Sequence, residues 1–239
     1  MNGDLAQQDD GSRLTLRLVG ALFREVTGVV IAAAILFVPA GRLDWAMGWA
    51  LVGIYALWVA ATALILIPNN AELYIERATR RAGGETWDVV LLSVIGVTTL
   101  AKYAVAGLDV RFGWTVPVPP ELQIAALVVA ALGYALTTWA LAVNRFFSKV
   151  VRIQEDRDQH VVTRGPYRFV RHPGYVGTMV FELATPIMLG SLWALIPGAL
   201  SVLLTVVRTH LEDRTLQREL EGYEKYAQQV PHRLLPGVW

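Results

Sequence analysis

The sequence contains no cysteine and few charged residues for its length. Without cysteine the chain has no disulfide, no thiolate metal site and no cysteine nucleophile. Aspartate, glutamate, lysine and arginine make up 17% of the 239 residues, whereas a soluble domain carries roughly a quarter. The formal net charge is only +1, so no overall positive charge attracts nucleic acid. The composition therefore excludes a disulfide-stabilised scaffold and disfavours a nucleic-acid-binding protein.

Long apolar runs take the place of the missing charge, and hydrophobic residues make up 54% of the chain. A helix needs about 20 apolar residues to cross the hydrocarbon core of a bilayer. Four segments meet that requirement, at residues 22–40, 45–67, 87–107 and 122–143. The sequence therefore predicts an integral membrane protein with an all-α fold.

A fifth apolar stretch, residues 175–207, is too long for a single span and is interrupted at Gly190 and Ser191. Glycine ends helices readily, because it adopts left-handed backbone conformations without steric cost. We therefore expect two helices that form a tight hairpin. The sequence predicts a polytopic transmembrane helix bundle of five to six spans, six if both arms cross the bilayer and five if the hairpin is re-entrant.

The distribution of lysine and arginine predicts the orientation, because basic residues are enriched in cytoplasmic loops. With the N-terminus inside, eighteen basic residues lie on the inner side and only Arg42 and Arg111 lie outside. Lys102 falls within a span near its outer end, and we expect its ammonium group to reach the interface. The size of the chain and its richness in alanine, valine and arginine indicate a bacterial protein. We therefore expect an inner-membrane protein with both termini in the cytoplasm.

Three regions follow one another along the chain. Residues 1–20 are a polar segment, expected to be cytoplasmic and to precede a first span that is not cleaved as a signal. Residues 21–144 contain four spans, with an amphipathic interfacial segment at residues 69–86. Residues 145–239 contain the motifs described next, the helical hairpin and a cytoplasmic tail. We expect the loop of this third region and a C-terminal helix to form the functional site.

The segment from Gly165 to Gly177, Gly-Pro-Tyr-Arg-Phe-Val-Arg-His-Pro-Gly-Tyr-Val-Gly, concentrates polar residues where a loop enters an apolar helix. Pro173 suits the first helical position, because its missing N–H would be unpaired there anyway. His172 should be extended, since a residue before proline avoids the helical region. Gly174 and Gly177 have no side chains, so we expect the first turn of the helix to be open to a ligand. The free backbone N–H groups at the start of the helix favour an anion there. With the charge of Arg171, the segment is either an anion-binding site or a basic interfacial anchor.

A second polar cluster, Arg208, Glu212 and Asp213, follows the last apolar stretch. Arg208 and Glu212 are four residues apart and share a helix face, where they could form a simple surface ion pair. Partly shielded from water, Arg208 would instead orient a carboxylate, and Glu212 would accept hydrogen bonds from ammonium or hydroxyl groups. Asp213 adds negative charge that suits a cationic ligand.

Glu182 lies about nine residues, roughly 13 Å, into the helix that follows Pro173. A carboxylate within a membrane is a candidate functional group, and a role in helix packing is the alternative. No metal is expected, because none of the four histidines has a second ligand at the spacing of a zinc site.

Several of these elements resemble one family in order and in membrane context. The strings His160–Tyr167 and Arg171–Gly177 are similar to the cofactor motif of the isoprenylcysteine carboxyl methyltransferase and phospholipid methyltransferase superfamily. Later elements are similar to the ending of that superfamily: Arg208, Glu212, Asp213 and the tail from Gly222 to Arg233. The resemblance covers roughly residues 154–236.

The resemblance implies S-adenosylmethionine as methyl donor, bound at the cytoplasmic face, and a lipophilic acceptor that enters from the bilayer. Carried onto this sequence, it implies a donor site formed by Gln154, His160, Val161, Val162, Tyr167, His172, Pro173, Gly174, Tyr175 and Glu212. The residue chemistry adds Arg171 and Asp213 to that site. We expect Arg208, His172 and Glu212 to act in catalysis, with Arg208 facing the acceptor.

The chemistry of the acceptor stays open at this stage. A carboxylate needs no general base, only Arg208 to orient it. A thiol or a phospholipid amine must first lose a proton, with help from His172, Glu212 or Glu182. The expected partners are therefore a lipophilic small molecule or lipid and the membrane lipids themselves, with no nucleic acid and no metal.

Two other functions fit parts of the pattern. Membrane reductases of the sterol reductase type resemble the same superfamily near the C-terminus and use NADPH. A non-catalytic membrane scaffold that kept the fold is the third possibility. The amphipathic tail at residues 223–236 either folds over the site as a lid or forms a surface helix.

Overall fold

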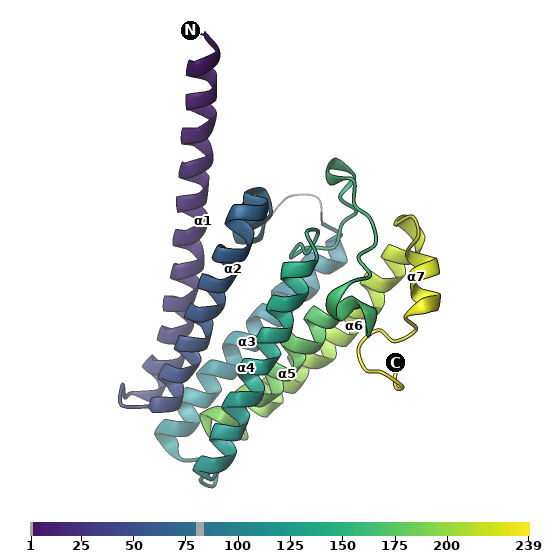
Figure 1. Cartoon of the computed structure of the whole chain (residues 1–239). Coiled ribbons are helices and arrows are strands. Elements are labelled where there is room, and N and C mark those ends of the chain that lie inside the picture. Colours follow the sequence, from purple (N-terminus) through teal and green to yellow (C-terminus); the bar gives the residue numbers. More distant parts are fainter. Residues whose placement is uncertain (1, 80–83) are drawn as a thin grey trace.

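The computed structural model describes residues 2–79 and 84–239, with side chains from residue 11 onward. Within these residues every regular element is a helix, which confirms the predicted all-α fold. The elements are α1 (Asn2–Ala40), α2 (Ala46–Ala78), α3 (Thr86–Phe112), α4 (Pro120–Val143), η1 (Glu155–Arg157), η2 (Gly165–Arg168), α5 (Pro173–Leu189), α6 (Leu195–Glu219) and α7 (Tyr223–Gln229). Figure 1 shows α1 to α6 as neighbouring rods, with the loop after α4, α7 and the C-terminus gathered at one end.

Five helices of the described chain are long and apolar enough to cross a membrane: α1 from Gly11 onward, α2, α3, α4 and α6. The shorter α5, with 17 residues, forms the predicted hairpin with α6. Gly190 follows α5 in the left-handed conformation, with φ of 77°, which is why the apolar stretch breaks at this point. The chain is therefore an integral membrane protein, and the expected bundle of five to six spans is confirmed.

Helix α2 bends at Asn70, where φ is −162° and ψ is 70°. Pro68 lies just before the bend, and a proline removes a helical hydrogen bond. The Asn70 side-chain oxygen accepts the N–H of Leu73 at 3.1 Å, so the helix resumes as it would after a cap. The turns after the bend are buried, including Glu76 and Arg77, at 7% and 6% exposure. The bend thus brings two charged residues into the protein at the end of the bundle.

Glycines allow α4 and α5 to pack backbone to backbone. A Cβ on Gly177 would lie 2.3 Å from the carbonyl oxygen of Gly133, and small residues permit such close contact between membrane helices. A Cβ on Gly174 would meet the ring of Phe147 at 2.5 Å. The glycines therefore make room for α4 and for an aromatic ring, which differs from the open first turn expected from the sequence.

Lys102 and Glu182 form an ion pair in the core of the bundle. The ammonium nitrogen lies 2.8 Å from Oε2, and the two side chains are 0% and 6% exposed. The expectation that Lys102 reaches the interface is wrong, because Glu182 on α5 offers a partner inside the bundle. Buried charges are tolerated when they are paired and hydrogen-bonded, and Thr99 adds a hydrogen bond to Glu182 at 3.4 Å. Neither charge lines the cavity described below. The contacts therefore describe a packing role for Glu182, while a functional role stays a prediction.

Candidate functional site

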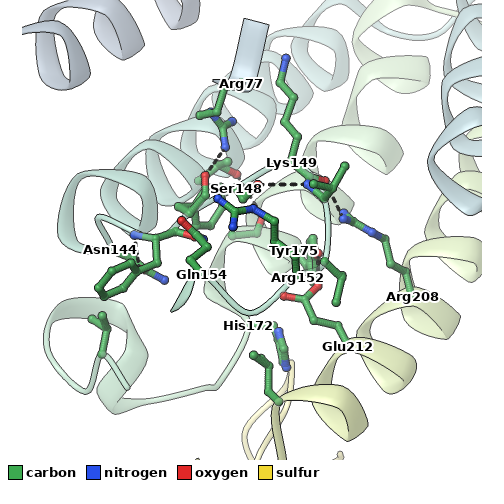
Figure 2. A pocket seen from close by; sticks show the side chains of 18 of the residues that line it. Arg77, Asn144, Ser148, Lys149, Arg152, Gln154, His172, Tyr175, Arg208 and Glu212 are labelled. Carbon is green, nitrogen blue, oxygen red and sulfur yellow. Dashed lines mark hydrogen bonds between the residues drawn. The ribbon is translucent and has the colours of Figure 1, made fainter. Parts of the chain in front are cut away.

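A cavity of about 800 Å³ lies where the loop after α4 and α7 meet the helices. Its polar wall includes Gln154, Tyr167, His172, Tyr175, Arg208 and Glu212. Its apolar wall, on α2, α3 and α4, includes Trp58, Leu92, Ile95 and Tyr134. Figure 2 shows the polar side chains converging from the loop, α5 and α6. A cavity with these two walls suits a ligand that is polar in one part and apolar in another.

Tyr175 connects the two polar clusters that the sequence predicted. Its hydroxyl donates a hydrogen bond to the Glu212 carboxylate, and the guanidinium carbon of Arg208 lies 5.1 Å from its ring centroid. The imidazole of His172 is parallel to the same ring within 8°, with the centroids 5.7 Å apart. The structure therefore gathers the three residues expected for catalysis around one tyrosine (Figure 2).

Arg208 takes its carboxylate partner from α3 and not from Glu212. Its Nε–H donates to Oδ1 of Asp88 at 2.6 Å, and its Nη2–H donates to the carbonyl of Lys149 at 2.7 Å. Asp88 is fully buried and also accepts the N–H of Val151 at 2.8 Å. Charge-assisted contacts of this kind fix both position and direction, so Asp88 sets how Arg208 faces the cavity.

Asp213 is the centre of a buried cluster that holds the C-terminal tail. Arg171 donates two hydrogen bonds to it, from Nε at 2.8 Å and Nη2 at 3.0 Å. Tyr223 and Arg233 also donate to this carboxylate, and Nε2 of His172 lies 3.2 Å from it. Asp213 is 0% exposed and does not line the cavity. These contacts describe an anchor for the tail, while a donor-binding role for Arg171 and Asp213 stays a prediction.

Burial shifts several pKa values around the cavity. It raises the pKa of Tyr167 above the ordinary value of 10.0, and it raises the pKa of Tyr223, with a further contribution from Asp213. Both hydroxyls are therefore protonated at neutral pH. Burial lowers the pKa of Lys149, and Glu25, at 3.2 Å, partly opposes that shift.

The other residues predicted for the donor site take different positions. Those on the cavity wall are Gln154, His160, Val161, Val162, Tyr167 and Gly174. Gln154 is held by a hydrogen bond from its Nε2 to the carbonyl of Phe146 at 2.7 Å. His160 is exposed, with its ring edge-on to Phe146 at 5.0 Å. Pro173 does not line the cavity and begins α5, as predicted.

Residues 144–152, which we call the strap, run along the cavity after α4. Several hydrogen bonds tie the strap to other helices. They include Arg77 Nη1 to Phe147 O at 2.6 Å, Ser148 Oγ to Glu76 Oε1 at 3.0 Å, Arg208 Nη2 to Lys149 O at 2.7 Å, and Val151 N to Asp88 Oδ2 at 2.8 Å. Figure 2 shows the strap between Arg77 on one side and Arg208 on the other. The strap therefore links α2, α3 and α6 by hydrogen bonds beside the cavity.

The tail forms another part of the cavity wall. The backbone N–H groups of Arg171 and His172 donate to the carbonyls of His232 and Arg233, each at 3.0 Å. Tyr226 of α7 lines the cavity and is buried. The tail thus packs against the site, while its action as a lid stays a prediction.

Two residues of the site, Asp88 and Arg77, are missed by the motif analysis. Asp88 lies in the first turn of α3, where an acidic residue is ordinarily explained by the helix dipole. Arg77 lies in the last turn of α2, at the end of an apolar helix where basic residues ordinarily mark the interface. One feature of the sequence does point to Asp88, which lies within an apolar segment. A carboxylate buried there requires a partner.

Comparison with known sequences identifies relatives for the central part of the chain. Residues 121–218 match the isoprenylcysteine carboxyl methyltransferase family. A probable protein-S-isoprenylcysteine O-methyltransferase of Oryza sativa subsp. indica is 30% identical over 115 residues, which are 47% of this chain and 60% of the relative. The protein-S-isoprenylcysteine O-methyltransferase of Schizosaccharomyces pombe is 30% identical over 117 residues, 46% of this chain and 48% of the relative. The chain thus spans about half to three fifths of the length of these relatives.

A solved structure of a eukaryotic intramembrane Ras methyltransferase, isoprenylcysteine carboxyl methyltransferase, is a distant match. It covers 99% of this chain and 97% of its own, with 18% identity and a TM-score of 0.46. At that distance the assignment depends on the sequence matches alone. The predicted resemblance to the isoprenylcysteine carboxyl methyltransferase superfamily is therefore confirmed for the region that runs from α4 to α6.

Proposed function

We propose that this chain is a methyltransferase of the membrane that uses S-adenosylmethionine and acts on a lipophilic acceptor. The observation that carries the proposal is the cavity in which His172, Tyr175 and Glu212, all inside the matched region, face apolar side chains of α2, α3 and α4. One cavity then receives a water-soluble donor and a lipid-soluble acceptor together.

The polar wall fits the chemistry of the donor. S-adenosylmethionine carries an ammonium group, ribose hydroxyls, an adenine ring and a sulfonium. The Glu212 carboxylate accepts a hydrogen bond from the Tyr175 hydroxyl and can accept further hydrogen bonds from an ammonium or hydroxyls. Tyr167 and Tyr175 offer aromatic faces to adenine and to the cationic sulfur. The wall therefore contains counterparts for the donor's charged and aromatic parts.

Bound S-adenosylmethionine would supply a methyl group made electrophilic by the positive sulfur. The residues of the chain have to orient the acceptor and keep water out of the site, and such positioning can account for much of a rate enhancement. Arg208, which is fixed by Asp88 and lies on the cavity wall, would orient an anionic acceptor atom. A carboxylate would need nothing further, whereas His172 or Glu212 would take the proton from a thiol or amine.

We propose a bacterial inner membrane as the location, with both termini and the cavity on the cytoplasmic side. The excess of arginine and lysine on the inner segments supports this orientation. The acceptor class covers lipophilic carboxylates, thiols and phospholipid amines. An isoprenylcysteine, which appears in the names of the relatives, belongs to the first group.

The proposal is tested by calorimetric titration of S-adenosylmethionine into purified protein in detergent. We expect micromolar affinity for the wild type, and a loss of at least tenfold in Glu212→Ala and His172→Ala. Arg168→Gln removes an exposed charge outside the cavity and serves as the control. NADPH is titrated in the same series. Binding of NADPH with no binding of S-adenosylmethionine by folded wild type would favour the reductase, and binding of neither would favour the scaffold.

A further inference from the structure

Among the residues that the structure describes, one lysine or arginine on the cavity wall lacks a carboxylate partner. Its wall includes Arg77, Lys149, Arg152, Arg171 and Arg208. Four of these have an acidic partner within 4.0 Å: Lys149 with Glu25, Arg152 with Asp156, Arg171 with Asp213, and Arg208 with Asp88. Arg77 has no ion pair to any residue whose side chain the structure describes. Its charge is therefore available to a ligand.

Arg77 is also short of hydrogen-bond partners. It is 6% exposed, and its Nη1–H donates to the carbonyl of Phe147 at 2.6 Å. Its Nε is buried and has no partner within the described part of the chain. A guanidinium has five N–H groups, and a buried charge left without partners is costly. The strap thus holds the side chain at Nη1, while the buried Nε has no acceptor among the residues that the structure describes.

The acidic groups nearest to Arg77 are committed elsewhere. Glu76, its neighbour in the sequence, lies 2.8 Å from Arg157 and 3.5 Å from Arg152. Glu25 pairs with Lys149. The other acidic residue on the cavity wall, Glu212, accepts a hydrogen bond from Tyr175 and forms no ion pair to a described side chain. Among the described side chains, Arg77 on α2 and Glu212 on α6 are thus the cation and the anion of the wall that have no ion-pair partner.

We propose that Arg77 binds a carboxylate inside the cavity. This inference rests on the proposed function and adds an anion subsite outside the matched region, at the buried end of α2. A planar guanidinium matches the two oxygens of a carboxylate. Because the other basic residues on the wall are already paired, the single free charge suits a monoanion better than a phosphate dianion. The carboxylate belongs either to the amino-acid part of the donor or to the acceptor.

Two pairs of ligands distinguish these sources. The donor pair is S-adenosylmethionine and its decarboxylated analogue, titrated into wild type and Arg77→Gln. If Arg77 holds the donor, wild type binds the decarboxylated analogue roughly tenfold to a hundredfold more weakly, and Arg77→Gln removes the difference. The acceptor pair is N-acetyl-S-farnesylcysteine and its carboxamide, compared in the same way. A difference that vanishes in the variant for this pair alone assigns Arg77 to the acceptor.

The comparison separates carboxylate binding from support of the strap. Glutamine keeps an N–H donor for the Phe147 carbonyl, and a purely structural role would weaken both members of a pair equally. Arg77→Lys, which keeps the charge, should retain part of the discrimination, and Arg168→Gln should retain all of it. Discrimination that persists unchanged in Arg77→Gln for both pairs overturns the subsite and leaves the proposed function standing. If folded wild type binds neither S-adenosylmethionine nor the farnesylcysteine, the subsite and the methyltransferase both fail.

Discussion

Arg208 on α6 and Asp88 on α3 are joined across the bundle by a 2.6 Å hydrogen bond from Nε to Oδ1. The two residues are 120 positions apart in the sequence, and only Arg208 lies in the matched region. The side chain expected to face the acceptor is therefore positioned by a part of the chain that the family motif does not include.

Asp88→Asn should lower the rate of methyl transfer more than it changes the affinity for S-adenosylmethionine. The asparagine cannot give Arg208 a second carboxylate oxygen, and the guanidinium would lose its fixed direction. Removing one partner of a buried pair also destabilises a protein by about 3 kcal/mol. The measurement is kcat and KM for both substrates beside thermal unfolding. A variant with reduced stability but unchanged kcat would contradict the positioning role.

The double substitution Asp88→Ala with Arg208→Ala gives a further check. Because the two residues share one interaction, their effects on the free energy of unfolding should be less than additive, by about 1 to 3 kcal/mol. Additive effects would show that the contact contributes little to the fold.

The ion pair between Lys102 and Glu182 leads to a second prediction. Lys102→Met should destabilise the bundle by about 3 to 5 kcal/mol, because it leaves the Glu182 carboxylate buried without a counter-ion. Adding Glu182→Leu should restore most of the stability, since apolar residues often replace a buried pair at little cost. The measurement is thermal unfolding in detergent, with S-adenosylmethionine binding as the second readout. Loss of binding in a stable double variant would show that the pair acts in the site.

The sequence predicts those features of the structure that depend on neighbouring residues in the chain. The apolar runs and Gly190 predict the helices and the hairpin, because length and a left-handed turn are local properties. The cluster of His172, Tyr175 and Glu212 follows from motifs at two helix ends. Asp88 is different, because its role depends on which helices touch.

The position of Lys102 also depends on a contact between helices that the sequence does not reveal. Its position in the span is compatible with reaching water, and only the depth of Glu182 on another helix decides against it. The sequence predicts open space for a ligand beside Gly174 and Gly177, but the atoms that fill this space belong to Phe147 and α4. Sequence periodicity identifies a face of a helix, whereas the neighbour of that face is a property of the fold.

Gly177→Ala should destabilise the contact between α4 and α5. The added Cβ would lie 2.3 Å from the carbonyl oxygen of Gly133 and 2.9 Å from the backbone nitrogen of Thr137, and these helical backbone atoms cannot move aside independently. A matched control is Gly53→Ala in α2, where nothing lies within 4 Å of the added atom. There alanine should be neutral or stabilising by about 0.5 to 1 kcal/mol, because it favours the helix. Thermal unfolding of the two variants tests the contrast, and equal shifts would contradict close packing at Gly177.

Alkaline pH should release the tail through Tyr223. Burial and the Asp213 carboxylate raise the pKa of Tyr223 above its ordinary value of 10.0. The folded state thus keeps a proton that the unfolded chain loses, so this residue's contribution is fully present below pH 10 and is lost as the pH rises towards the folded pKa. Tyr223→Phe removes the ionisable group and its hydrogen bond to Asp213, so it should lower stability at pH 8 but flatten the decline above pH 10. Thermal unfolding from pH 8 to 11 measures both effects, while hydrogen exchange of residues 223–239 reports whether the tail leaves first. If stability declines equally steeply in wild type and variant, a residue other than Tyr223 causes the alkaline transition. Tyr167 and Tyr226 would then be the next residues to substitute, because burial also raises their pKa values.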